Sequence, residues 1–189
     1  MATATQVRNH RRDLSMLITI AANDLRILFR DFDSGEAARD ALEAFLPQLV
    51  AIYGSAAAAL GADWYDDLRE AAAVKGRFIA IPAELPDQGR TDSLAGWAVS
   101  PMFQEVPDKA TTLVKTVGGV QRIIANADRD TIRVSSVQDR GARGWARAGT
   151  GNCEFCAMLI GRGAVYTEAT ADFESHDHCG CVAVPEFKS

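Results

Sequence analysis

Cysteine and histidine gather near the carboxyl end of this sequence. The metal-binding residue types in this segment are Cys153, Cys156, His176, His178, Cys179 and Cys181, and no other cysteine occurs in the chain. Two thiolates two residues apart can hold one ion, and zinc prefers four tetrahedral nitrogen and sulfur ligands. The spacing C-x2-C-x19-H-x2-C is close to that of a two-knuckle zinc site. The pattern predicts a structural zinc centre.

The segment offers more donors than a tetrahedral ion needs. We expect four of five residues to bind zinc: Cys153, Cys156, His176, Cys179 and Cys181. Cys181 lies two residues past Cys179, so in an extended segment its thiol would point to the opposite face, and the choice between the two stays open. Two other interpretations are cysteines that only pack, reduced or as disulfides, and a redox pair at Cys153 and Cys156.

Sequence patterns for other catalytic sites are missing. The chain has no G-x-S-x-G, P-loop, dinucleotide-binding or H-E-x-x-H motif. Apart from His10, both histidines belong to the cysteine-rich segment, so a Ser-His-Asp triad would have to borrow a candidate ligand. We expect no enzyme and no small-molecule substrate.

The remainder of the chain has the composition of a soluble helical protein. The whole chain has 189 residues, 48% of them hydrophobic and 24% charged, and a formal net charge of −5. Apolar periodicity predicts helices over 13–31 with Asp13 as N-cap, 36–46 with Ser34 as cap, from Pro47 to about 70, 108–126 and 128–140. A loop over 76–92 and a short helix that begins at Asp92 or Ser93 separate the halves.

These elements predict a mainly α fold in two parts. We expect a helical bundle-like domain over residues 1–148 and a Cys/His zinc-knuckle module over 149–189, with a short β-hairpin that pairs 163–166 with 181–184. The basic and apolar stretch at residues 8–22 is better explained as an amphipathic helix than as a secretory signal. No run reaches the roughly 18 apolar residues of a membrane span, so no membrane partner is expected.

Arginine is concentrated between residues 122 and 147. Six arginines fall in this range, at 122, 129, 133, 140, 143 and 147, against three aspartates. One interpretation is a solvated helix face with internal ion pairs. The other is a cationic strip that contacts nucleic acid or an acidic protein surface, which would make the chain a zinc-stapled nucleic-acid-binding protein.

Several motifs resemble those of one protein family. They are Gly144-Trp145-Ala146-Arg147, Cys153-Glu154-Phe155-Cys156, Arg162-Gly163-Ala164-Val165-Tyr166 and His176-Asp177-His178-Cys179-Gly180-Cys181. Together with the upstream segments around Tyr53-Gly54, Trp64-Tyr65-Asp66 and Arg77-Phe78, they resemble the MuF-like minor capsid proteins of actinobacterial tailed phages. His178 beside Cys179 departs from the family pattern and makes the histidine ligand ambiguous.

The resemblance implies a structural virion component that acts in head morphogenesis. It would be made in the host cytoplasm, present in few copies, and located in the capsid interior or at the portal vertex. The partners implied are portal and capsid proteins, with packaged DNA as a further candidate. Some relatives carry a fused maturation protease or toxin domain, and we expect neither here.

Overall fold

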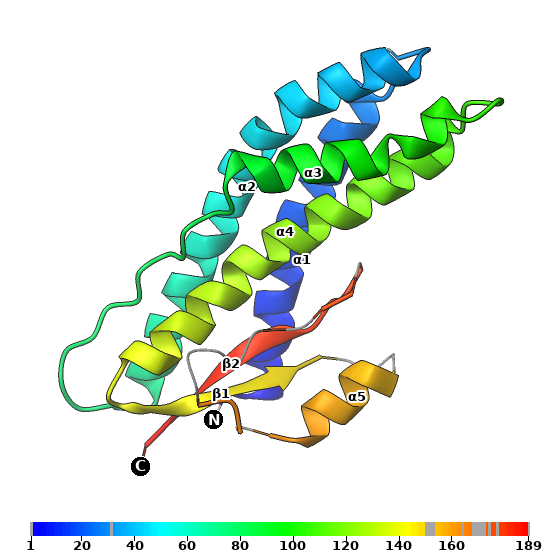
Figure 1. Cartoon of the computed structure of the whole chain (residues 1–189). Helices are drawn as coiled ribbons and strands as arrows, with labels where there is room; N and C mark the ends of the chain where they lie inside the picture. The colour runs from blue at the N-terminus through cyan, green and yellow to red at the C-terminus, as the bar shows by residue number, and fades with distance from the viewer. Residues whose placement is uncertain are drawn as a thin grey trace.

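The computed structural model describes residues 2–30, 32–149, 154–163, 165–167, 173, 175–176 and 178–188. The elements are α1 (Ala4–Leu28), α2 (Gly35–Ala71), α3 (Gln88–Ala98), the 3-10 helix η1 (Ser100–Phe103), α4 (Lys109–Gln138), β1 (Ala142–Ala148), α5 (Glu154–Gly161) and β2 (Val182–Phe187). Long helices dominate, and β1 and β2 form a small antiparallel sheet beside them (Figure 1). The expected fold class, mainly α with a small β element at the carboxyl end, is confirmed.

The helices α1, α2 and α4 enclose the core. The end of α1 lies beside the start of α4, where the Lys109 ammonium donates hydrogen bonds to the carbonyls of Arg30 and Phe32, at 3.2 and 2.7 Å. The helices α2 and α4 run in the same direction and finish near each other (Figure 1). Aliphatic residues at most 2% exposed fill the interior: Leu25, Leu42, Leu46, Leu49, Ile124 and Ile132.

The first helix begins earlier than the apolar pattern predicts. The Thr3 hydroxyl accepts a hydrogen bond from the Gln6 N–H, and the Gln6 side chain accepts one from the Thr3 N–H. This capping box fixes the start of α1 at Ala4. The prediction of Asp13 as N-cap was wrong, because the first turns of α1 precede the apolar stretch that the prediction used.

Two helices continue where the sequence predicts a break. Ser34 caps α2 as expected, but the helix then runs through Pro47. A proline inside a helix costs about 3 kcal/mol, and burial of Leu46 and Leu49 on either side offsets this cost. Likewise, α4 is one helix from Lys109 to Gln138, so the expected break near residue 127 is absent.

A close approach explains the glycine in the middle of α4. A Cβ built on Gly119 would lie 2.3 Å from the Leu94 Cδ1 of α3. Gly119 thus lets α3 pack directly on α4.

The third helix begins earlier than predicted. The cap of α3 is Asp87, whose carboxylate accepts a hydrogen bond from the Arg90 N–H at 3.2 Å, so the expected start at Asp92 or Ser93 was too late.

The sheet joins two segments that the sequence does not pair. Antiparallel β1 and β2 align Ala148 with Val182 and Trp145 with Pro185. The predicted hairpin partner was wrong, since Tyr166 makes only an isolated bridge with Trp145. The strand over 182–184 was predicted correctly, as part of β2. The expected domain boundary after residue 148 falls between the two strands of this sheet.

The long second helix also has the length and apolar composition of a membrane span, with a window of mean hydropathy 1.4. The core helix of a soluble protein passes the same test. Of the residues in that apolar stretch 39% are buried, and Leu42, Leu46 and Leu49 of the helix are at most 2% exposed.

Candidate metal centre

Three cysteine thiols meet beside the sheet. Cys156 comes from α5, whereas Cys179 and Cys181 immediately precede β2. All three residues are 4–5% exposed, and their sulfur atoms lie within 4.8 Å of one another. The His176 Nε2 lies 3.7 Å from the Cys156 Sγ, at the edge of this cluster. Four candidate donors therefore come from two segments, and Cys156 lies 20 or more residues before the other three.

The spacing of these atoms matches that of tetrahedral zinc ligands. With Zn–S near 2.3 Å and Zn–N near 2.0–2.1 Å, a tetrahedral site places two sulfurs about 3.8 Å apart and a sulfur and a nitrogen about 3.6 Å apart. The observed Cys156–Cys179 sulfur distance is 3.8 Å, and the Cys156–His176 distance is 3.7 Å. The three thiols therefore fit a metal ion, and His176, which contacts the Cys156 thiol, is not part of the group of donors that all lie within 4.8 Å of one another.

Cys179 and Cys181 lie on the same side of their segment, against expectation. The prediction assumed extended backbone, in which residues two apart point to opposite faces. Instead, His178 has a φ of 62°, and the Cys179 N–H donates to the His176 carbonyl at 3.2 Å. This turn ends where Cys179 begins, and the Cys179 and Cys181 sulfurs lie within 4.8 Å of each other, so the two thiols need not compete for one position.

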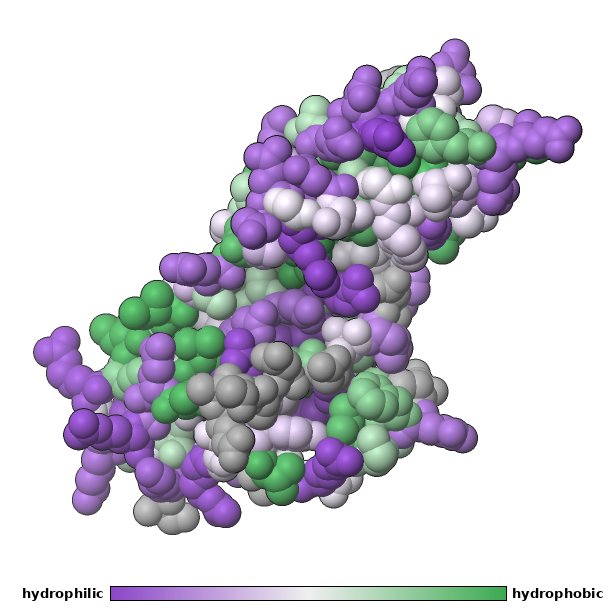
Figure 2. All heavy atoms as spheres, in the orientation of Figure 1, coloured by the Kyte–Doolittle hydropathy of each residue, from purple (hydrophilic) through white to green (hydrophobic). Residues whose placement is uncertain are grey.

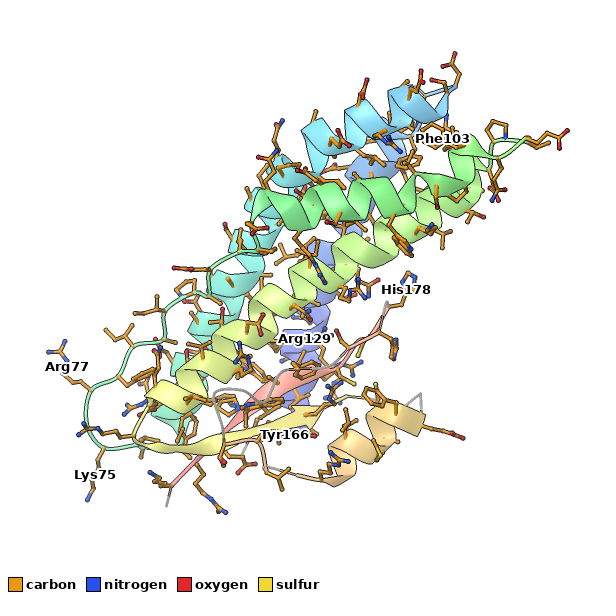
Figure 3. All side chains as sticks on the ribbon, viewed as in Figure 1. Lys75, Arg77, Phe103, Arg129, Tyr166 and His178 are labelled. Carbon is orange, nitrogen blue, oxygen red and sulfur yellow. The ribbon has the colours of Figure 1, made fainter. Side chains whose placement is uncertain are left out.

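Two of the predicted candidates are not in the cluster that the structure describes. Cys153 lies outside the described residues. His178 instead points to α4, where its Nδ1 is 2.9 Å from the Gln121 Oε1. Figure 3 shows it at the far end of the segment that leads into β2. Of the two histidines, His176 is the one that lies near a thiol of the cluster.

A buried arginine holds the backbone at Cys179 and Cys181. Arg129, on α4, is 1% exposed. It donates to the carbonyl of Cys179 at 2.7 Å and to the carbonyl of Cys181 at 2.8 and 3.0 Å (Figure 3). Its guanidinium also lies 4.7 Å from the centre of the Phe173 ring. Two carbonyls that precede β2 are thus fixed to the helical core.

A second arginine faces the same ring. Arg147, on β1, places its guanidinium 3.8 Å from the centre of the Phe173 ring, and Trp145 stacks on that ring at 5.6 Å. Phe173 is 5% exposed. These contacts surround Phe173 with two cations and an indole, and they fix the chain a few residues before the candidate ligands.

The thiol environment favours a thiolate at Cys179. A hydrogen bond from the Cys181 thiol, helped by the positive charge of Arg129, lowers the pKa of Cys179 to about 4. Conversely, the pKa of Cys181 is raised, because its thiol interacts with the Cys179 sulfur and is buried. Metal ions bind thiolates rather than thiols, so at least one donor is ready for a cation.

The predicted arginine strip does not form one exposed face. Arg129 and Arg147 are buried, as described above, and Arg133 pairs with Asp130 at 3.2 Å. Only Arg140 and Arg143 of the six are exposed. Arg129 lies four residues after Ala125 and three before Ile132, both buried, so helical periodicity could have placed it on the inner face.

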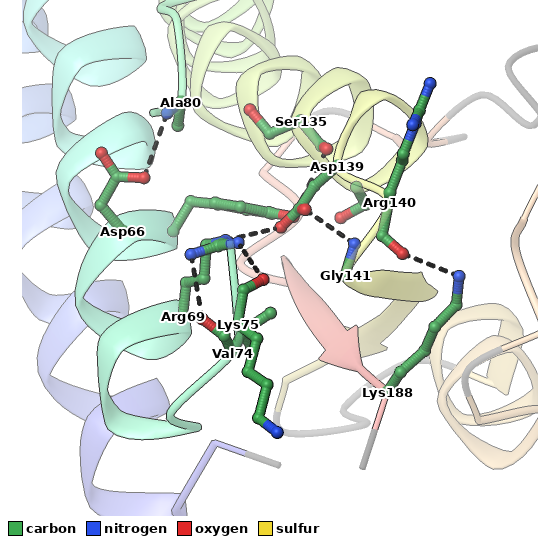
Figure 4. A network of polar contacts seen from close by, with 12 residues as sticks. Asp66, Arg69, Val74, Lys75, Ala80, Ser135, Asp139, Arg140, Gly141 and Lys188 are labelled. Atoms are coloured by element: carbon green, nitrogen blue, oxygen red, sulfur yellow. Dashed lines mark hydrogen bonds and ion pairs between the residues drawn. The ribbon is translucent and has the colours of Figure 1, made fainter. Parts of the chain in front are cut away.

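An aspartate at the end of α4 positions β1 (Figure 4). The Asp139 carboxylate accepts from Arg69 of α2 at 2.8 Å, from the Tyr65 hydroxyl at 3.2 Å and from the Gly141 N–H at 2.8 Å. Burial, together with the negative charge of Asp139, raises the pKa of Tyr65. Because β1 begins at Ala142, this network ties the sheet to the ends of α2 and α4.

A buried contact between a histidine and an aspartate joins the three long helices. His10 of α1 places its Nε2 2.8 Å from the Asp128 Oδ1 of α4, with both side chains at most 1% exposed. The imidazole stacks on Trp64 of α2 at 3.8 Å. A Cβ on Gly61 would lie 2.8 Å from the Asp128 carbonyl oxygen. No local pattern predicts the contact between His10 and Asp128, because the two residues are far apart in the chain.

The fold and site define a helical protein whose small carboxyl-terminal sheet carries a buried three-cysteine cluster able to hold a metal ion. The family model described as VG15 protein matches residues 1–189. The chain therefore belongs to the VG15 family, a phage and viral protein family. No curated protein and no solved structure matches it.

Proposed function

We propose that this chain is a MuF-like minor capsid protein that acts in phage head morphogenesis, in the capsid interior or at the portal vertex. The observation that carries the proposal is the VG15 family match over the whole chain, together with the cysteine and histidine motifs that resemble MuF-like proteins. Its partners would be portal and capsid proteins, and it would turn over no substrate.

Within this function, the cysteine cluster serves as a structural zinc site. Cys156, Cys179, Cys181 and His176 can supply four donors, and Cys153 is an alternative donor. A catalytic zinc keeps one position open for water, whereas these thiols are buried and donors are in surplus. Bound zinc would contribute folding free energy to a segment with few large apolar residues.

Mass spectrometry of purified particles tests the role in the virion. The chain should co-purify with assembled heads through a density gradient, and crosslinks should connect it to portal or capsid proteins. A chain found only in the lysate, and never in particles, contradicts the proposal. Elemental analysis of the purified chain tests the metal separately, and about one zinc per chain is expected.

A further inference from the structure

The segment between α2 and α3 is held on the bundle in an extended form. The Ala80 N–H donates to the Asp66 carboxylate at 3.0 Å, and the Ala83 N–H donates to the Thr131 hydroxyl at 2.9 Å. Phe78 packs against Tyr65, with ring centres 5.7 Å apart. Anchors on both α2 and α4 thus hold the second half of a strap, residues 75–83, although no regular secondary structure forms there.

The strap presents aliphatic side chains outward. In extended chain, alternate side chains point to opposite faces, and here Ala80 is 5% exposed whereas Ile79 and Ile81 are 68% and 71% exposed. Figure 2 shows hydrophobic residues gathered at the lower left of the molecule, where Figure 1 places the strap. A fixed segment that exposes two neighbouring isoleucines is suited to binding.

Basic residues lie at the start of the strap. Lys75 and Arg77 are exposed, and both extend away from the bundle (Figure 3). Glu84 lies at the other end and is also exposed. The backbone N–H groups of Ile79 and Ile81 have no hydrogen-bond partner among the described residues. The strap thus combines an apolar centre, open backbone donors and a positive end.

We propose that the strap, residues 75–83, docks into a groove of another protein that is lined with aliphatic side chains and rimmed by acidic residues near Lys75 and Arg77. The inference rests on the proposed function in one respect, because it expects the partner to be a virion protein. A nucleic-acid backbone would match the two cations but not the isoleucines. A second copy of this chain is an alternative partner that the crosslinking test below distinguishes.

Site-specific photocrosslinking in phage-producing cells tests the docking. The photoreactive residue p-benzoylphenylalanine replaces Ile79 or Ile81 in the full chain, and Val114, 61% exposed on α4, serves as the control position. Positions 79 and 81 should crosslink to one phage-encoded protein, at a segment rich in aliphatic and acidic residues. Position 114 should not give that product.

Charge reversal then tests the predicted chemistry. The double variant Lys75→Glu, Arg77→Glu should lower the crosslink yield at least about tenfold, because like charges would face the acidic rim. Both side chains are exposed, so thermal melting should change little. Crosslinks to nucleic acid or to a second copy, no crosslink, or a yield unchanged by charge reversal would each overturn the docking proposal. Recovery of the unsubstituted chain in particles decides the proposed function independently.

Discussion

Replacing Arg129 with glutamine should weaken metal binding without touching a ligand. The arginine donates three hydrogen bonds to the carbonyls of Cys179 and Cys181. Glutamine is shorter, so both carbonyls would lose these partners in a buried site. Each unsatisfied buried acceptor costs about 1–3 kcal/mol, which gives about 2–6 kcal/mol for the pair. This cost falls on the backbone segment that carries the Cys179 and Cys181 thiols.

Competition with a zinc chelator of known affinity measures the effect. If the variant destabilises only the zinc-bound form, by about 2 kcal/mol, then zinc affinity falls roughly 30-fold. Arg140→Gln is the matched control, because Arg140 is exposed and its side chain is remote from the thiols. Far-UV circular dichroism should show that the long helices persist in both variants. If folded R129Q binds zinc within about twofold of the parent chain, the carbonyl bonds do not organise the site.

Three further predictions concern the helical part. Asp128→Ala should lower the free energy of unfolding in urea by about 3–5 kcal/mol, because it leaves buried His10 without its partner. An equal effect of Asp128→Ala in a His10→Ala background would show that the two residues are not coupled. Gly61→Ala should lower the free energy of unfolding by about 1–3 kcal/mol, because the added methyl overpacks the core. Gly96→Ala, where a Cβ meets nothing within 4 Å, should instead raise it by up to about 1 kcal/mol. Equal changes in the melting temperatures of the two variants would contradict this. The hydrogen bond from Thr111 lowers the pKa of Asp108. At neutral pH the Asp108→Ala variant should therefore be less stable than the parent chain, and this difference should disappear as the pH falls through the lowered pKa of Asp108. A difference in melting temperature that persists in acid would refute the prediction.

Local sequence signals predicted much of the helical part. Ser34 and Asp108 cap α2 and α4 as their residue types indicate, and Pro101 follows the end of α3. Element ends failed where tertiary packing decides them. Pro47 reads locally as a helix start, but neighbouring leucines packed on other helices keep α2 continuous.

The candidate site was predictable in composition and not in geometry. The spacing of Cys156, His176 and Cys179 pointed to a metal centre, and the structure brings their side chains together. The role of Arg129 could not be found from spacing, because its partners are backbone carbonyls some fifty residues away. The left-handed conformation of His178 was also not predictable from its residue type, because residues other than glycine adopt it rarely.

The strands limit how far loss of the metal can spread. Cys156→Ser removes a candidate ligand from α5, an eight-residue helix that is too short to be stable alone. However, Val182 and Ala183 of β2 are 0–1% exposed and remain paired with β1, which Asp139 ties to the helical core. We therefore expect hydrogen exchange to accelerate in α5, while amides of β1, β2 and α4 keep their protection. A matched Ser175→Ala variant should leave α5 protected. Rapid exchange throughout β2 in C156S would show instead that the metal, and not the helical core, holds the sheet.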